Sequence, residues 1–450
     1  MLGINELLNL AEDTIKALEK IKLDGYAVVV TSKLSRQVRF AANKISVTKT
    51  WDETNFSILV EKDKRISAFS VGYASRNLIP KMAQLAIEAI MKAPPREDYA
   101  PLPEPADKYP SIPAEMDKTL LDQPEKLLDL AKNAIDTGLQ EGAKKIAGTI
   151  LAEAYNFVLV TSAGFRDGNS LSNVYLDVRA FVTKEATGHA SIASRTVSGI
   201  NAKEVASIAA HDAKLSENSK TIEPGKYNTV FTIDATASLM NLVGGATSAY
   251  AVDAGFSFFI KKLGTQVGPE NLNVEDNPLD SNGYRIRNFD DEGVPTKRLR
   301  IIENGVLKTY LHNRFTAKKF NAEHTGHAGW VFPHAWELTV YPGDVAWEEL
   351  LEMIGRGLIV SNATYIRFQN YIEGAFSAII RDGVFYVENG EIKHAIKGLR
   401  LSDSMPRILQ NIIALGKDRR QVFHWWLEEG IPVITPPMAV KEVGFTKAFA

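Results

Sequence analysis

The chain has 450 residues, of which 45% are hydrophobic, so it can bury large cores and exceeds the size at which one core usually divides into domains. Its 52 basic and 54 acidic side chains leave a formal net charge of −2, so no chain-wide positive field attracts a phosphate backbone, and direct nucleic-acid binding is disfavoured. The absence of cysteine excludes disulfides, thiolate metal ligands and thiol nucleophiles.

The first segment, MLGINELLNLAEDTIKALEKIK, predicts an amphipathic helix, because its apolar residues recur at helical spacing and its charged residues lie on the other face. It has neither the apolar central region nor the small-residue cleavage site of a signal peptide. No apolar run approaches the length of a membrane span. We therefore expect a cytoplasmic protein without a membrane partner.

An antiparallel meander of short strands is predicted next. The expected strands are at residues 26–31, 37–42, 44–49, 56–61 and 65–71. Pro80 fits the first turn of a helix that ends near Ala93. The following segment, 93–112, contains six prolines, which predict an extended strap over the surface or an ordinary loop.

A second group of helices and strands completes the first half. A helix is expected after Pro124, strands at 146–152, 157–161 and 174–182, and a further helix at 202–214. The polar segment 216–226 favours a linker, so we predict an N-terminal domain at 1–216 and a C-terminal domain at 217–450. Segregated strands and helices indicate an α+β fold, with antiparallel strands in a mixed α/β N-terminal domain and a mainly antiparallel, barrel-like C-terminal domain.

The stretch 274–326 contains more turn and loop motifs than any other part of the sequence. Asn304-Gly305 lies between two apolar-rich runs, which predicts a hairpin with positive φ at both turn residues. Asn389-Gly390 repeats this signal further along the chain. The acidic loop 290–293, Asp-Asp-Glu-Gly, precedes the first hairpin, and its acidic residues favour turn-forming roles over a calcium site because the spacing of a calcium loop is absent.

These motifs resemble the TldD/PmbA family, whose members are described as modulators of DNA gyrase and as peptidases, and within it the PmbA (TldE) branch. The matching pieces are FDDEGVPT at 289–296, IENGVLKTYL at 302–311, Thr316-Ala317 and Thr325-Gly326. Less sharp matches are TSKLSRQVRFAANKISVTKTWDE at 31–53, APP at 93–95 and VENGEI at 387–392. The order and the spacing of the pieces agree with the family as well.

The resemblance also identifies a departure. In the TldD branch the helix after the strand predicted near 227–234 carries HExxxH, and a later cysteine completes a zinc site. The corresponding residues here are Asn-Leu-Val-Gly-Gly-Ala at 241–246, and no histidine occurs between His211 and His312. The resemblance therefore implies that this chain holds no catalytic zinc, and that zinc is expected in a TldD-type partner.

The implied function is that of a PmbA/TldE-type subunit of a cytoplasmic zinc metallopeptidase, pairing with a TldD-type chain around a cavity that admits peptides or unfolded proteins. Substrate-binding candidates are Asn241, Gly244 and Gly245, together with Trp425 and Trp426, although paired tryptophans are more often core or interface residues. One alternative is a homodimeric peptide-binding or regulatory module without protease activity. Substrate identity, the type of dimer and any activity of the chain alone are left open.

A second alternative is an autonomous metallohydrolase that uses His324 and His327 as metal ligands. His312 and His334 lie near them in the sequence, so a metal in this region is left open. The His-x-x-His spacing here passes through a glycine and lacks the helix on which zinc peptidases present their ligands. Hydrogen-bonded loop histidines are the simpler interpretation.

Overall fold

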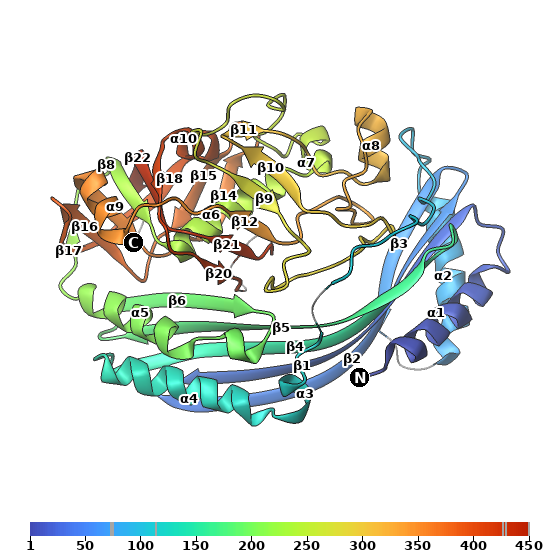
Figure 1. Ribbon diagram of the computed structural model, residues 1–450, viewed down its shortest axis with the longest axis horizontal. Helices are drawn as coiled ribbons and strands as arrows, with labels where there is room; N and C mark the ends of the chain where they lie inside the picture. The colour runs from blue at the N-terminus through green and yellow to red at the C-terminus, as the bar shows by residue number, and fades with distance from the viewer. Residues whose placement is uncertain (73–75, 113–114, 425–426, 428–429, 449–450) are drawn as a thin grey trace.

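The computed structural model describes residues 1–72, 76–112, 115–424, 427 and 430–448. In this part of the chain one long, curved sheet lies beneath two further sheets, with the N-terminal half below and the C-terminal half above in the view of Figure 1. None of the described helices combines the length and the apolar composition needed to cross a membrane.

The first sheet has six strands in the order β3-β2-β1-β4-β5-β6, and each neighbouring pair is antiparallel. The strands are β1 (Gly25–Ala41), β2 (Lys44–Lys62), β3 (Arg65–Gly72), β4 (Lys145–Thr161), β5 (Arg166–Phe181) and β6 (Thr187–Ser194). The separate strands predicted at 26–31 and 37–42 are therefore wrong, because both belong to β1. The polar residues between them hid its continuity, yet every residue from 27 to 40 pairs with β4.

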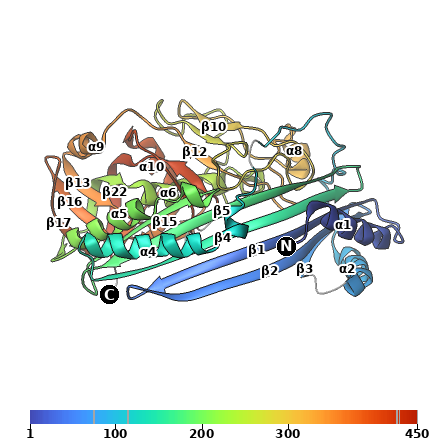
Figure 2. The ribbon, with the colours of Figure 1, turned by 60° about the horizontal axis from the view of Figure 1, so that its bottom comes forward.

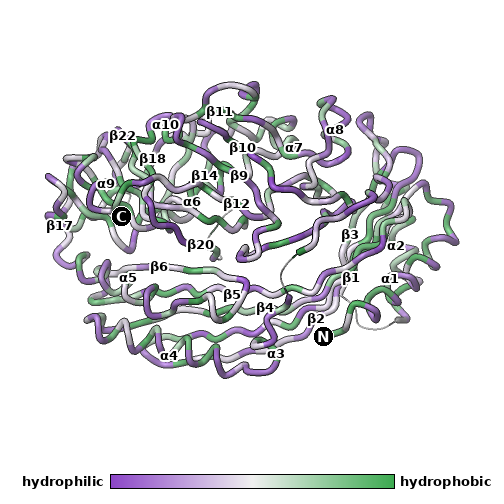
Figure 3. Tube along the Cα trace, viewed as in Figure 1, coloured by the Kyte–Doolittle hydropathy of each residue, from purple (hydrophilic) through white to green (hydrophobic). Residues whose placement is uncertain are grey.

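Helices cover the outer, convex face of this sheet, as Figures 1 and 2 show. They are α1 (Ile4–Leu18), α2 (Ile79–Lys92), the short α3 (Thr119–Asp122), α4 (Glu125–Gln140) and α5 (Ala202–Leu215), with one-turn 3₁₀ segments η1 (Arg76–Leu78) and η2 (Val197–Gly199). Hydrophobic and hydrophilic residues alternate along the strands (Figure 3). Val28 and Val30 consequently pack against α1 and α2, whereas Ala27 faces the C-terminal half.

The C-terminal half contains two sheets in its described part, with strand orders β11-β10-β9-β12-β21-β20 and β14-β15-β18-β22-β8-β13-β16-β17-β7, while β19 pairs with β22. Their strands are β7 (Lys220–Thr221), β8 (Gly225–Phe231), β9 (Val274–Asp276), β10 (Leu299–Glu303), β11 (Val306–Leu307), β12 (Leu338–Val340), β13 (Arg356–Val360), β14 (Thr364–Asn370), β15 (Ala375–Ile379), β16 (Val384–Glu388), β17 (Glu391–Lys397), β18 (Leu399–Ser404), β19 (Ile412–Leu415), β20 (Arg420–Val422), β21 (Val433–Thr435) and β22 (Met438–Lys447). The helices are α6 (Ile233–Ala246), α7 (Ala249–Asp253), α8 (Arg314–Phe320), α9 (Trp347–Ile354) and α10 (Met405–Gln410).

The α+β class is confirmed, and most strand pairs of the C-terminal half are antiparallel, with β8–β13, β12–β21 and β7–β17 parallel. The barrel-like expectation needs correction, because neither strand order closes on itself among the described residues. The predicted boundary between residues 216 and 217 stays a prediction; it falls directly after α5. The largest hydrophobic core surrounds α6 and includes residues from both C-terminal sheets.

The two Asn-Gly hairpins are confirmed. Asn304 and Gly305 have φ of +48° and +74° between β10 and β11, and Asn389 and Gly390 have φ of +55° and +76° between β16 and β17. A side chain at Gly305 would collide with the backbone, since its Cβ would lie 2.2 Å from the carbonyl oxygen of Gly268. Glycine is therefore required by both conformation and space.

The proline-rich segment 93–112 is an extended strap, one of the two interpretations that the sequence left open, the other being an ordinary loop. It carries no helix or strand, and it crosses from the N-terminal half to the loops of the C-terminal half. The hydroxyl group of Tyr109 donates a hydrogen bond of 2.7 Å to the carbonyl oxygen of Gly293, and Leu102 is buried beside Ile286 and Phe289. The strap thus ties the acidic loop to the first sheet.

Candidate functional site

Helix α6 holds three of the predicted substrate-binding residues. The side-chain amide of Asn241 donates a hydrogen bond to the backbone carbonyl of Ile431, and only 1% of Asn241 is exposed. A Cβ atom at Gly244 would lie 2.5 Å from Cδ1 of Leu338, so this glycine permits close contact between α6 and the second sheet. Gly245 is partly exposed. Asn241 and Gly244 thus serve packing within the C-terminal half, and substrate binding by these residues stays a prediction.

The other predicted substrate-binding residues, Trp425 and Trp426, lie outside the described residues, so their role also stays a prediction. The segment that leads to them lies at the junction of the two halves. Phe423 stacks on Tyr284 with 4.6 Å between ring centroids and meets Tyr175 of β5 edge-on at 5.8 Å.

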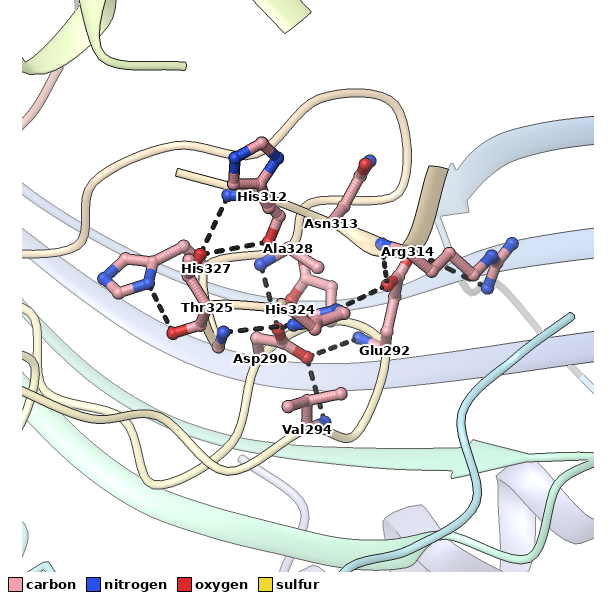
Figure 4. Close-up of polar contacts among 12 residues, drawn as sticks. Asp290, Glu292, Val294, His312, Asn313, Arg314, His324, Thr325, His327 and Ala328 are labelled. Carbon is pink, nitrogen blue, oxygen red and sulfur yellow. Dashed lines mark hydrogen bonds and ion pairs between the residues drawn. The ribbon is translucent and has the colours of Figure 1, made fainter. Parts of the chain in front are cut away.

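The acidic loop at 290–293 is organised by Asp290, which is fully buried. Its Oδ1 accepts hydrogen bonds from the backbone N–H groups of Glu292 and Val294, both at 3.0 Å, and its Oδ2 accepts from Ala328 at 2.9 Å (Figure 4). Burial, reinforced by the charge of Glu292, raises the pKa of the Asp290 carboxyl to about 6. Gly293 completes the turn with φ of +79°. The turn-forming interpretation of the loop is therefore confirmed.

Both ring nitrogens of His324 form hydrogen bonds with other groups of the protein (Figure 4). The backbone N–H of Gly326 donates to Nδ1 at 3.1 Å, so the proton of the neutral ring is on Nε2, which donates to Oε2 of Glu292 at 2.9 Å. Burial lowers the pKa of His324, but the hydrogen bond with Glu292 and the charge of Asp290 outweigh it and raise the pKa.

His327 points to a different carboxylate and is fully buried. Its Nδ1 donates to the carbonyl oxygen of Thr325 at 2.8 Å, and its Nε2 lies 2.6 Å from Oδ2 of Asp276. Within the described residues, no group of three or more histidine, aspartate or glutamate side chains is arranged to hold a metal ion. Metal binding by His324 and His327 stays a prediction, and these contacts do not favour it because both rings would have to change partners.

The two neighbouring histidines are neutral groups in apolar surroundings. Burial lowers the pKa of His312 to about 4, and the nearby charge of His324 acts in the same direction. Burial likewise lowers the pKa of His334 to about 4, and its ring meets that of Trp336 edge-on at 4.3 Å. His334 therefore offers an uncharged imidazole at the surface of a groove.

That groove lies between the concave face of the first sheet and the loops of the C-terminal half. It consists of two adjoining hollows of about 390 and 510 Å³, which share Val29, Asp291 and His334. Tyr155 and Phe157 of β4 form one wall. The opposite wall includes residues 329–332 together with Arg285, Arg287, His334 and Trp336.

Arg287 joins the two walls of the groove. Its guanidinium lies 4.8 Å from the ring centroid of Phe157 and 4.4 Å from that of Trp336, and its Nη1 lies 2.8 Å from Oδ1 of Asp291. Arg285 lines the same groove, where it adds a second cation. The sequence analysis missed these residues, although the alternation of Arg285 and Arg287 with the buried Ile286 indicated that both arginines share one face.

The sequence and the fold of this chain were compared with those of known proteins. Residues 224–447 match the family described as PmbA/TldA metallopeptidase C-terminal domain. The chain is 28% identical over 207 residues to the metalloprotease PmbA of Escherichia coli O157:H7, which covers 44% of this chain and 43% of that protein. It is 34% identical over 209 residues to a metalloprotease of Methanocaldococcus jannaschii, covering 44% and 45%. The match thus spans less than half the length of these curated relatives.

The whole fold is shared with solved structures. A protein of Thermotoga maritima, described as a modulator of a DNA gyrase, has a TM-score of 0.83 and 24% identity over 97% of this chain and 99% of its own. TldE of Thermococcus kodakarensis has a TM-score of 0.84 and 20% identity over 97% and 100%. The fold and the matched C-terminal domain define a metallopeptidase-like protein. The chain belongs to the PmbA/TldD family, as its FDDEGVPT and IENGVLKTYL motifs implied.

Proposed function

We propose that this chain is a PmbA/TldE-type subunit of a metallopeptidase, which binds peptide in the groove described above and leaves the catalytic zinc to a TldD-type partner chain. The observation that carries the proposal is the groove between the concave sheet and the loops at 285–291 and 329–336. It combines aromatic walls with arginine side chains and exposed apolar residues, as sites for extended peptides do.

The composition of α6 supports the assignment of zinc to the partner. This helix, which the family resemblance equates with the HExxxH helix, contains no histidine, glutamate or cysteine. Its single carboxylate, Asp234, already accepts hydrogen bonds from Ser191 and Arg420. Asn241 and Ala246 stand where the two histidines of that motif are expected; the Asn241 amide is bonded to the backbone carbonyl of Ile431, and Ala246 is buried.

The groove has the chemistry for a peptide that carries apolar side chains. Phe332 and Val331 are 49% and 57% exposed at its edge, where the two neighbouring side chains offer apolar surface to a ligand. The guanidinium of Arg285 can pair with a peptide carboxylate or carbonyl group. Neutral His334 can accept or donate a hydrogen bond without the desolvation cost of a charge.

The test is to measure the zinc content of the purified chain, and its hydrolysis of an unstructured polypeptide alone and after addition of a TldD-type chain. We expect zinc far below one equivalent and no hydrolysis by this chain alone. With the partner, hydrolysis should exceed that of the partner by itself. One zinc per chain with activity in isolation would refute the proposal and favour the metallohydrolase with His324 and His327.

The same experiment distinguishes the peptidase subunit from the alternative, a homodimeric binding or regulatory module. Saturable peptide binding by this chain, measured by titration calorimetry, without any gain of hydrolysis upon adding the partner would favour a binding or regulatory module. Light scattering of the mixture distinguishes the two further, because a peptidase subunit must form a complex with the partner.

A further inference from the structure

A second cavity lies at the junction of the two halves, away from the peptide groove. It has a volume of about 430 Å³, within the range of small-molecule sites. One wall is α5, through Ile208, Asp212 and Leu215, and the other is formed by the start of α6 and by α9, β13 and β16. Apolar side chains make up most of the interior, among them Trp347 and Phe385.

The charges behind this cavity are largely matched by protein partners. Asp234 accepts hydrogen bonds from the backbone N–H and the hydroxyl group of Ser191, at 2.9 and 2.6 Å, and from the guanidinium of Arg420. His189 is held between Asp177, at 2.8 Å, and the amide of Asn362, at 2.8 Å. Asp234 and His189 therefore already have hydrogen-bond partners within the protein.

Asp212 differs from them, because it forms no ion pair with any residue that the structure describes. Its Oδ2 lies against Gly383, where an added Cβ would be 3.1 Å away, and the hydroxyl group of Ser361 lies beside the carboxyl. Burial raises the pKa of Asp212 to about 7, and the charge of Asp234 adds to the effect. His189 acts on Asp212 only through its charge and is itself held by Asp177, so among the described residues an ionised Asp212 has no cation in direct contact.

The entrance of the cavity admits a positive ligand. Glu141, His211, Lys417 and Asp418 are exposed around it, so its two acids outnumber its single lysine. The aromatic surfaces of Trp347 and Phe385 are also favourable to a cation. Because α5 belongs to the N-terminal half and the opposite wall to the C-terminal half, an occupant contacts both.

We propose that this junction cavity is a binding site for a small organic cation, a primary ammonium group on an apolar body, with Asp212 as its counter-ion. The ammonium group would lie against the Asp212 carboxylate, and the apolar body would lie against Ile208, Trp347 and Phe385. The site is independent of peptide binding and of any zinc chemistry.

The test uses the full chain and two probes of equal shape, 2-phenylethylammonium and the uncharged 2-phenylethanol, at about pH 8.5, where Asp212 is ionised. Binding is followed by titration calorimetry at constant ionic strength. We expect saturable binding of the ammonium that is at least about tenfold tighter than that of the alcohol, because a charge-assisted hydrogen bond is added. Equal affinities, or no saturable binding of the ammonium, would overturn the proposal.

Variants locate the site. Asp212→Asn should remove the preference for the ammonium, whereas Asp129→Asn, an exposed carboxylate on α4, should leave it unchanged. Ile208→Trp, which fills the cavity without altering its charge, should abolish binding of both probes and tests the location of the site without changing Asp212. Retention of ammonium binding by either cavity variant would show that the cation binds elsewhere and that the proposal is wrong.

Discussion

The guanidinium of Arg314, at the start of α8, forms an ion pair with the carboxylate of Glu61 in β2, and their side chains are only 3% and 1% exposed. The hydroxyl group of Tyr99 in the strap donates to the other oxygen of Glu61 at 3.1 Å. The backbone N–H of Arg314 donates to Glu292 at 3.1 Å. The two halves of the molecule and the acidic loop thus meet at one buried set of charges.

Arg314→Met should destabilise the protein by about 3–5 kcal/mol, since it leaves Glu61 and Glu292 buried without their cation. Chemical denaturation measures the change. Burial raises the pKa of Glu61 against the influence of Arg314, so Glu61→Gln combined with Arg314→Met should recover part of the loss. As a control, Arg356→Met removes a solvent-exposed ion pair and should cost far less than Arg314→Met. Equal costs for the two methionine variants would contradict this reasoning.

Local signals predicted much of the fold. The strand predicted at 174–182 is the second half of β5, where Val174, Leu176 and Val178 share one buried face, and the Asn304-Gly305 turn followed from backbone conformation alone. The length of β1 did not follow, because polar residues such as Ser32 and Ser35 are buried there by neighbours far away in the sequence. Likewise, Phe157 and Arg287 are 130 residues apart and meet only through the tertiary fold, so the groove was not predictable from spacing.

Gly244→Ala should destabilise the protein by about 1–3 kcal/mol, because the new methyl group overpacks α6 against Leu338 and Ile431. Alanine is otherwise the better helix former, so propensity alone predicts the opposite sign. Thermal unfolding decides between the two. Gly225→Ala is the matched control, since the nearest atom to its Cβ, in Tyr227, is 3.9 Å away. A stabilised Gly244→Ala variant would show that α6 is not closely packed.

Asp212→Asn should stabilise the protein increasingly as the pH rises from about 4 to about 7. The folded state keeps the proton on Asp212 up to about pH 7, whereas the unfolded chain releases it near 3.8, so the wild type loses stability across this interval. Asparagine has no proton to release. The difference should reach on the order of 2 kcal/mol above pH 7, after allowance for water in the cavity.

Unfolding by urea at a series of pH values measures this difference. Besides Asp234, the charges of His189 and Asp382 act on Asp212, so the measured difference belongs to this coupled group of residues, with Asp212 as the one that is changed. A difference between the two proteins that stays constant from pH 4 to 8 would be incompatible with a raised pKa at Asp212.

His324→Gln should leave hydrolysis by the reconstituted pair with a TldD-type chain within about twofold of the wild-type rate. Glutamine can accept from the backbone N–H of Gly326 and donate to Glu292, so it replaces both contacts of His324. The zinc content of the pair should not change. Loss of zinc or of activity in a folded variant would favour a catalytic role for this histidine.

Phe332→Ser should weaken peptide binding about fivefold, because the exposed ring at the edge of the groove loses about 1 kcal/mol of apolar contact. Its stability should change little, since the ring is 49% exposed and contributes little to the core. Met91→Ser removes another exposed apolar side chain, on α2 at the outer face of the first sheet, and should leave peptide affinity unchanged. If both substitutions weakened binding equally, peptide would be adhering to exposed apolar surface in general, and the groove would lose its assignment as the binding site.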